Sequence, residues 1–156
     1  ETWQAMEEIA ASGRARAIGV SNFLVHHLEE LLALGGTVPA VNQVEFHPCL
    51  VQADLLAFCK AKGIQVESWS PLMQGDILNN GVVMRLAEKY GRTPAQIILR
   101  WNLQHGVVAI PKSVRRSRID ENARIFDFEM TDQDMRHLDS LEDGTRTGPH
   151  PDVFGF

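Results

Sequence analysis

Residues 93–113 read TPAQIILRWNLQHGVVAIPKS and contain the signals for a helix, a strand and a polar strand end in one run. Thr93 can cap the helix, Pro94 suits its first position, and Gln96 completes a capping box. The apolar run 107–110 after the helix predicts a short buried strand. A helix that leads into a buried strand is the repeating unit of α/β proteins with parallel sheets.

The same alternation extends in both directions from this stretch. Apolar residues at helical spacing predict helices, and short apolar runs bounded by turn residues predict strands. The expected order is a helix that ends at Gly13, a strand over 15–20, a helix that ends at Gly35, a strand over 40–46, a helix over 53–62, a strand over 64–68, a loop with Pro71 and Gly75, a helix over 82–90, the helix and strand quoted above, a helix that begins around Ser117, and a helix from Thr131 to about Leu141.

Short, mostly apolar strands separated by helices are typical of a parallel sheet that is covered on both faces. A (β/α)8 barrel of the TIM type takes about 250 residues, so these 156 residues can supply about half of one. We expect an α/β fold in which residues 1–143 form a half barrel and residues 144–156 form an irregular tail. Phe154 and Phe156 in this tail either line a pocket or are disordered.

Composition excludes several classes of function. No apolar run approaches the roughly 20 residues that cross a bilayer, and a net charge of −5 argues against a nucleic-acid partner. Cys49 and Cys59 are the only cysteines and lack the spacing of a metal site, which favours a reducing compartment. We therefore expect a cytoplasmic protein without a membrane span, a metal or bound nucleic acid.

Polar residues gather where the expected strands end. Helix capping or loop hydrogen bonds explain any one of these positions as well as ligand binding does. Their coincidence favours a ligand site, because the carboxyl ends of parallel strands form the binding rim of α/β proteins. The positions are Ser21 and Asn22, then Gln43 and Glu45, then Ser68, Trp69 and Ser70, and finally Lys112 and Ser113.

The motifs at these positions resemble successive strand ends of the aldo-keto reductases, and the likeness runs from Thr2 to about Leu141. The chain resembles bacterial members that reduce small carbonyl compounds, including diketogluconate reductases. The resemblance implies that the chain is the carboxyl-terminal half of a TIM-type barrel that reduces aldehydes and ketones with NADP(H). The motifs are Gly-Val-Ser-Asn-Phe at 19–23, Val-Asn-Gln-Val-Glu-Phe-His-Pro at 41–48, Ser-Trp-Ser-Pro-Leu at 68–72, and Ile-Pro-Lys-Ser at 110–113 followed by Arg118, Glu121 and Asn122.

The same resemblance implies a cofactor-binding role for matching residues and assigns none of them to catalysis. An amide needs both donors and acceptors, which serine, asparagine and glutamine provide, and arginine suits a phosphate. The implied ligands are Ser21, Asn22 and Gln43 for the nicotinamide carboxamide, Trp69 for the nicotinamide face, Ser70, Leu72 and Gln74 for the pyrophosphate and its covering loop, Lys112, Ser113 and Arg118 for the 2′-phosphate, and Glu121 and Asn122 for adenine.

The basic cluster can also be interpreted from its charges alone, without the family resemblance. Lys112, Arg115, Arg116 and Arg118 crowd the start of an expected helix, where the helix dipole disfavours each cation by a few tenths of a kcal/mol. A bound anion would compensate for this, whereas the alternative is a solvated charged helix face. Arg115 and Arg116 depart from the family pattern, which has uncharged residues more often there.

The family's tyrosine, lysine, aspartate and histidine for catalysis belong to the first half of the barrel. Tyr90 is the only tyrosine here and lies at a helix end, and His47 belongs to a structural His-Pro pair. We therefore expect an isolated chain without turnover, acting on a small carbonyl substrate only with a complementary half. The alternative is a non-catalytic nucleotide-binding or structural half barrel that associates with itself, since open sheet edges favour pairing.

Overall fold

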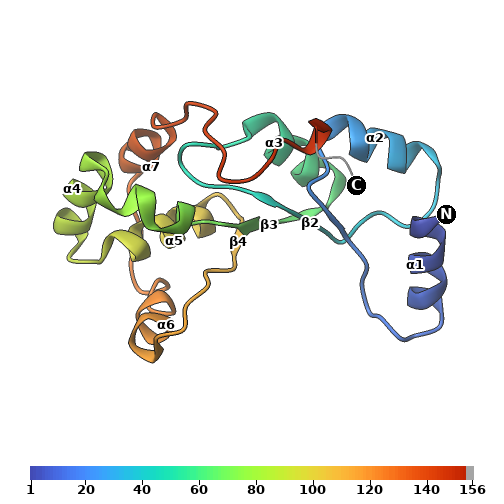
Figure 1. Ribbon diagram of the computed structural model, residues 1–156, viewed down its shortest axis with the longest axis horizontal. Helices are drawn as coiled ribbons and strands as arrows, with labels where there is room; N and C mark the ends of the chain where they lie inside the picture. Colours follow the sequence, from blue (N-terminus) through green and yellow to red (C-terminus); the bar gives the residue numbers. More distant parts are fainter. Residues whose placement is uncertain (154–156) are drawn as a thin grey trace. The chain divides into compact units, whose positions relative to one another are not determined.

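The computed structural model describes residues 1–153 and contains a four-stranded sheet with the strand order β1-β2-β3-β4 (Figure 1). The neighbours β1 and β2 pair in parallel, as do β3 and β4. The predicted α/β class with four strands separated by helices is confirmed. Phe154 and Phe156 lie outside the described residues. The strands are β1 Val20–Ser21, β2 Val41–Glu45, β3 Gln65–Trp69 and β4 Val108–Ala109.

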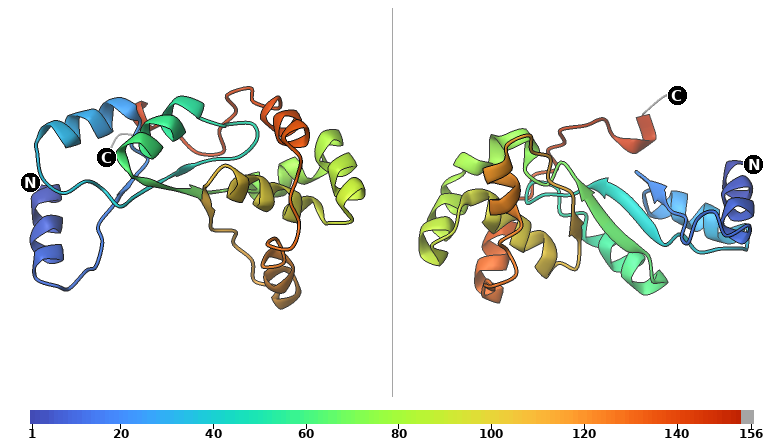
Figure 2. Two further views of the ribbon diagram at one scale, coloured as in Figure 1. Left: turned by 180° about the vertical axis from the view of Figure 1, so that it is seen from behind. Right: turned by 90° about the horizontal axis from the view of Figure 1, so that it is seen from below.

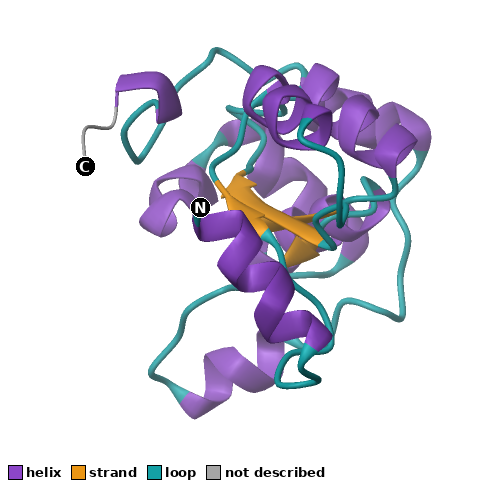
Figure 3. Ribbon diagram, turned by 90° about the vertical axis from the view of Figure 1, so that its right-hand side faces the viewer, coloured by secondary structure: helices purple, strands orange, loops and turns teal. Residues whose placement is uncertain are grey.

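Helices precede or follow every strand along the chain. Figure 3 colours the helices purple and the strands orange. Within residues 1–153, none of the helices combines the length and the apolar character that a membrane span requires. The α-helices are α1 Thr2–Ala11, α2 Val25–Ala33, α3 Ala53–Lys62, α4 Gly81–Tyr90, α5 Pro94–Gln104, α6 Arg116–Asn122 and α7 Asp132–Asp139, and the 3-10 helices are η1 Met73–Asn79 and η2 Pro151–Val153.

The chain divides into two compact units. Unit 1 comprises Glu1–Val44 and Gln52–Val66, and unit 2 comprises Glu45–Val51 and Glu67–Phe156. Each unit therefore draws on two separate stretches of the sequence, and the strands β2 and β3 contribute residues to both.

Unit 1 contains the pair of strands β1 and β2, with Val20 opposite Asn42 and Ser21 opposite Gln43. Asn42 is fully buried, and its side chain accepts from the Phe23 amide at 3.3 Å and donates to the Phe23 carbonyl oxygen at 2.8 Å. These two bonds fix the chain as it leaves β1. The apolar core of this unit includes Ile18, Leu28, Val44, Leu55, Ile64 and Val66.

Unit 2 is built around α5, which begins with the predicted capping box of Thr93 and Gln96. Trp101 on this helix is fully buried, stacks on Phe46 with ring centroids 4.7 Å apart, and donates from its indole nitrogen to Asp139 at 2.7 Å. The helix α4 contacts both α5 and α7 (Figure 2). This packing places the amino-terminal end of α5 beside the candidate site described below.

Two predicted strands are shorter than expected. The strand predicted over 15–20 is reduced to β1, because the residues before Ile18 are small or charged and have low strand propensity. The strand predicted over 107–110 is reduced to β4. The expected loop with Pro71 and Gly75 contains η1, and the expected irregular tail contains η2.

Candidate functional site

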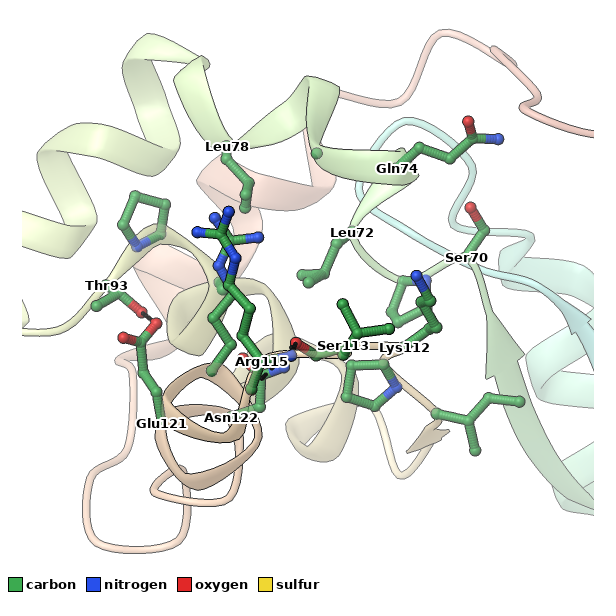
Figure 4. A pocket seen from close by; sticks show the side chains of 18 of the residues that line it. Ser70, Leu72, Gln74, Leu78, Thr93, Lys112, Ser113, Arg115, Glu121 and Asn122 are labelled. Atoms are coloured by element: carbon green, nitrogen blue, oxygen red, sulfur yellow. Dashed lines mark hydrogen bonds between the residues drawn. The ribbon is translucent and has the colours of Figure 1, made fainter.

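A cavity of about 690 Å³ lies within unit 2 (Figure 4). Its wall is formed by the residues that follow β3, by η1, by the start of α5, by the residues that follow β4, and by α6. The cavity is thus lined by the segments that follow two neighbouring parallel strands, where α/β proteins bind ligands.

The cavity brings together most of the residues that were predicted from the sequence to bind the nucleotide. They come from two segments about forty positions apart, which only the fold makes neighbours. The segment after β3 contributes Ser70, Leu72 and Gln74, and the segment after β4 contributes Lys112, Ser113, Arg118, Glu121 and Asn122. Trp69, Ser21, Asn22 and Gln43 are not among the lining residues.

One wall of the cavity carries uncompensated positive charge. Lys112, Arg115 and Arg118 all line it and have exposed side chains, and no ion pair joins any of them to a carboxylate within residues 1–153. Arg116 does not line the cavity and instead binds both carboxylate oxygens of Asp120 at 3.0 Å. The cluster therefore divides into three free cations at the cavity and one paired cation outside it, which suits a multiply charged anion.

The segment after β3 adopts an unusual backbone conformation. Ser70, Met73 and Gln74 have φ angles of 54°, 48° and 57°, and Gly75 follows at 108°. Each left-handed residue other than glycine costs about 1–3 kcal/mol, and such strain concentrates at functional sites. The turns are closed by backbone bonds from Met73 to Ser70 at 2.9 Å and from Gly75 to Leu72 at 2.7 Å. The strained turn directs this segment along the cavity wall.

The position of α6 depends on the start of α5. The Gln96 side chain is buried, and its amide nitrogen donates to the carbonyl oxygens of Glu121 and Arg124, each at 3.0 Å. Its oxygen accepts from the Thr93 amide at 3.0 Å. From the sequence, Gln96 was predicted only as a capping residue, because nothing local indicates its bonds to Glu121 in α6 and to Arg124 just after it.

In unit 1, the three residues predicted to bind a carboxamide lie together at the carboxyl end of β1. The Gln43 carbonyl oxygen accepts from the Ser21 hydroxyl at 2.9 Å and from the Asn22 amide at 2.8 Å. Asn22 has a left-handed φ of 58°, which turns the chain sharply after the strand. These residues belong to the other unit, and their role in binding stays a prediction.

A buried carboxylate, Glu45, ends β2 and connects it to the tail. Its Oε1 atom accepts from the Thr147 amide at 2.5 Å, from the Thr147 hydroxyl at 2.6 Å, and from His47 Nε2 at 3.1 Å. The Thr147 hydroxyl also lies 3.1 Å from the hydroxyl of Ser70. The sequence predicts Glu45 at the strand end but gives no signal for Thr147, because the two residues are 102 positions apart.

These contacts set the charge states of the buried pair. Burial raises the pKa of Glu45, but the hydrogen bonds from Thr147 and His47 outweigh it and leave the pKa below its ordinary value. Burial lowers the pKa of His47, and the neighbouring carboxylate offsets this only in part. At neutral pH Glu45 is thus a carboxylate and His47 is neutral. Because a carboxylate only accepts, His47 carries its proton on Nε2.

The chain's one tyrosine is occupied elsewhere. The Tyr90 hydroxyl donates to Asp134 at 2.5 Å and accepts from the Thr131 amide at 3.0 Å. It therefore joins α4 to α7 and does not line the cavity.

The profile of the aldo/keto reductase family matches residues 1–143, which is most of the chain. The chain belongs to the aldo/keto reductase family. It is 57% identical over its whole length to the glyoxal reductase of Bacillus subtilis strain 168, of which it covers 56%. It is 45% identical to the methylglyoxal reductase DkgA of Escherichia coli K12, with 99% of the chain and 57% of that protein covered.

Solved aldo/keto reductases share the fold. A crystal structure of a Gox0644 mutant in complex with NADPH matches with a TM-score of 0.95 at 42% identity, covering all of this chain and 58% of that one. The expected half of a TIM-type barrel is confirmed by this match together with the four-stranded parallel sheet. The chain spans about half the length of the aldo/keto reductases that it matches.

Proposed function

We propose that this chain is the NADP(H)-binding part of a reductase that converts small aldehydes and ketones to alcohols. The observation that carries the proposal is the cavity wall on which Lys112, Arg115 and Arg118 lie without carboxylate partners within residues 1–153. A 2′-phosphate carries about two negative charges near neutral pH and is the group for which such a wall is suited. The relatives named as reductases and the NADPH complex support the same assignment.

The residues of this cavity fit a phosphorylated nucleotide. Lys112, Ser113 and Arg118 would hold the 2′-phosphate, and Arg115 adds a further cation beside them. Glu121 and Asn122 would contact adenine. Ser70, Leu72 and Gln74 on the opposite segment would face the pyrophosphate, with Trp69 at the nicotinamide. When bound, NADPH supplies the hydride that reduces a carbonyl carbon.

In this proposal the cavity residues bind and orient the nucleotide, and the proton for the alcohol product comes from elsewhere. The cavity lining contains neither tyrosine nor histidine among the described residues, and Tyr90 is bound to Asp134. Carbonyl reduction needs a proton donor near the developing alkoxide. We therefore propose that the chain alone binds NADPH without turnover and that a complementary half, or a second copy, supplies the rest of the site.

Equilibrium titration tests the proposed binding. The chain should bind NADPH at least about tenfold more tightly than NADH, because one charge-assisted contact to the 2′-phosphate contributes about 1.5–3 kcal/mol. Adenosine 2′,5′-bisphosphate should compete with NADPH, and adenosine 5′-monophosphate should compete poorly. Equal affinity for NADPH and NADH, or no binding of either, would overturn the assignment. The absence of all binding is what the structural, self-associating alternative predicts.

A further inference from the structure

The tail segment Arg146–Gly148, called the strap below, crosses the carboxyl ends of β2 and β3 within unit 2. Thr147 at its centre bonds Glu45 at the end of β2 and approaches Ser70 just after β3. Arg146 is mostly buried and lies 3.9 Å from the second carboxylate oxygen of Glu45. The strap therefore has a defined attachment and is not a loosely packed loop.

The attachment is strong because the carboxylate is buried and ionised. Glu45 is 1% exposed, and Thr147 alone supplies two donors to it, at 2.5 and 2.6 Å. Hydrogen bonds to a charged group are stronger than those between neutral groups, and leaving a buried carboxylate without them is strongly destabilising. The Thr147 contacts therefore hold the strap in place in the native state of unit 2.

The next residue of the strap lies directly against Trp69. A Cβ atom placed on Gly148 would be 2.5 Å from Cη2 of Trp69 and 3.3 Å from Cζ3. The φ angle of Gly148 is outside the left-handed region, so its backbone conformation alone does not require glycine. The indole ring, not the backbone geometry, leaves no room for a side chain at this position.

We propose that Glu45, acting through Thr147, is a positioning residue that holds the strap against the edge of Trp69 and so fixes the orientation of the indole. This inference rests on the proposed function, in which Trp69 packs against the nicotinamide ring of NADP(H). A ring that is contacted at its edge has less freedom to rotate about its side-chain bonds, so its flat face is oriented before the cofactor binds. Preorganisation of this kind improves affinity because less motion is lost on binding.

Fluorine NMR tests the strap without any cofactor. The chain labelled with 5-fluorotryptophan has three resonances, for Trp3, Trp69 and Trp101, and Trp69→Phe identifies that of Trp69. Thr147→Val and Gly148→Ala should each move or broaden the Trp69 resonance and leave the other two in place. Thr147→Ser keeps the hydroxyl and should restore the wild-type position. Thr145→Val is the matched control, since Thr145 lies in the same tail and bonds Asp143 instead.

The resonances of Trp101 and Trp3 report on the rest of the fold. An unchanged Trp69 resonance in both Thr147→Val and Gly148→Ala would overturn the inference. A comparable displacement of all three resonances would overturn it as well, because the strap would then act on the whole fold.

Ligand titrations test the consequence for the cofactor. Thr147→Val and Gly148→Ala should raise the Kd of NADPH by about fivefold, the equivalent of about one hydrogen bond. They should leave the Kd of adenosine 2′,5′-bisphosphate unchanged, since that ligand lacks nicotinamide. Equal losses for both ligands would refute the link to Trp69. If the wild-type chain binds neither compound, the proposed function and the cofactor part of this inference fail, whereas the fluorine shifts still decide whether the strap holds Trp69.

Discussion

The Thr93 hydroxyl donates a hydrogen bond of 2.8 Å to the carboxylate of Glu121. The same oxygen accepts from the amide of Gln96 at 3.3 Å and so caps α5. One side chain therefore both begins a buried helix and restrains a residue that lines the cavity. Changes at Thr93 should affect stability and nucleotide binding together.

Thr93→Val should lower the free energy of unfolding by about 1 kcal/mol through loss of the cap. It should also raise the Kd of NADPH by about threefold, because Glu121 loses the bond that orients it. Thr131 provides a matched control, since its hydroxyl caps α7 and bonds Asp134 in the same way outside the cavity. Urea denaturation should show a similar loss of unfolding free energy for Thr93→Val and Thr131→Val. NADPH titration should show a raised Kd for Thr93→Val only. Equal NADPH affinities in the two variants would contradict this role of Thr93.

Arg118→Ala should weaken NADPH binding by about 10- to 100-fold, since a charge-assisted bond contributes about 1.5–3 kcal/mol. NADH binding should change little, because NADH lacks the 2′-phosphate. Arg116→Ala removes the same charge from the same helix at a residue that is paired with Asp120. Titration of both variants with NADPH and NADH checks the assignment of Arg118 to the 2′-phosphate. The assignment fails if Arg116→Ala weakens NADPH binding as much as Arg118→Ala does.

Asp134 should make stability depend on acid pH. Burial raises its pKa, but bonds from Lys89, Tyr90 and Thr131 outweigh this and lower it from 3.8 to about 2. Because the folded-state pKa is depressed, the stabilisation is complete above about pH 4 and is lost as the pH falls toward 2. It amounts to about 1–2 kcal/mol once solvent screening at the exposed Lys89 is considered.

Asp134→Asn should remove this contribution at neutral pH. Urea midpoints measured between pH 7 and pH 2 should show the variant less stable than the wild type at pH 7 and the two converging near pH 2. A constant difference across that range would mean that the charge of Asp134 does not contribute.

Gly19→Ala should destabilise unit 1. A Cβ atom at this position would lie 2.6 Å from the Val41 carbonyl oxygen, a backbone atom of the neighbouring strand. Displacing the strand should cost about 1–3 kcal/mol, the usual cost of overpacking. Gly13→Ala is the comparison for space, since no atom lies within 4 Å of a Cβ there, although its φ of 77° adds backbone strain. Thermal melts of both variants measure the loss of stability. A Gly19→Ala variant with the wild-type melting temperature would exclude the clash with Val41.

Local signals in the sequence were sufficient for the α-helices and for their alternation with strands along the chain. Gly63 ends α3 in the left-handed conformation, and the predicted bounds 53–62 match the helix. Thr93 and Pro94 likewise begin α5 where the capping signal placed it. Such signals work because caps and turns depend on residues within four positions of one another.

The site was predictable only in the parts that carry recognisable motifs. The motifs of the segments after β3 and β4 predicted that they bind the nucleotide, and in the fold both segments line one cavity. The attachment of Thr147 to Glu45 and the bonds of Gln96 to α6 were not foreseen. These contacts join residues far apart in the chain, and no local pattern encodes which distant groups will meet. The cytoplasmic location and the carboxamide ligands remain predictions.

The attachment of Thr147 also has a kinetic consequence. Joining it to Glu45 closes a loop of 102 residues, for which chain-closure entropy costs about 4 kcal/mol. The bonds from the Asp143 and Gly144 amides to the Cys49 carbonyl oxygen and the Arg146–Glu45 pair close nearly the same loop. The tail should therefore dock as one segment after the helices and strands of unit 2 have formed, and should detach before they unfold. Amide hydrogen exchange at Thr147 should therefore be faster than at Ile98, and brief protease treatment should cleave the tail first while the nucleotide-phosphate wall stays intact.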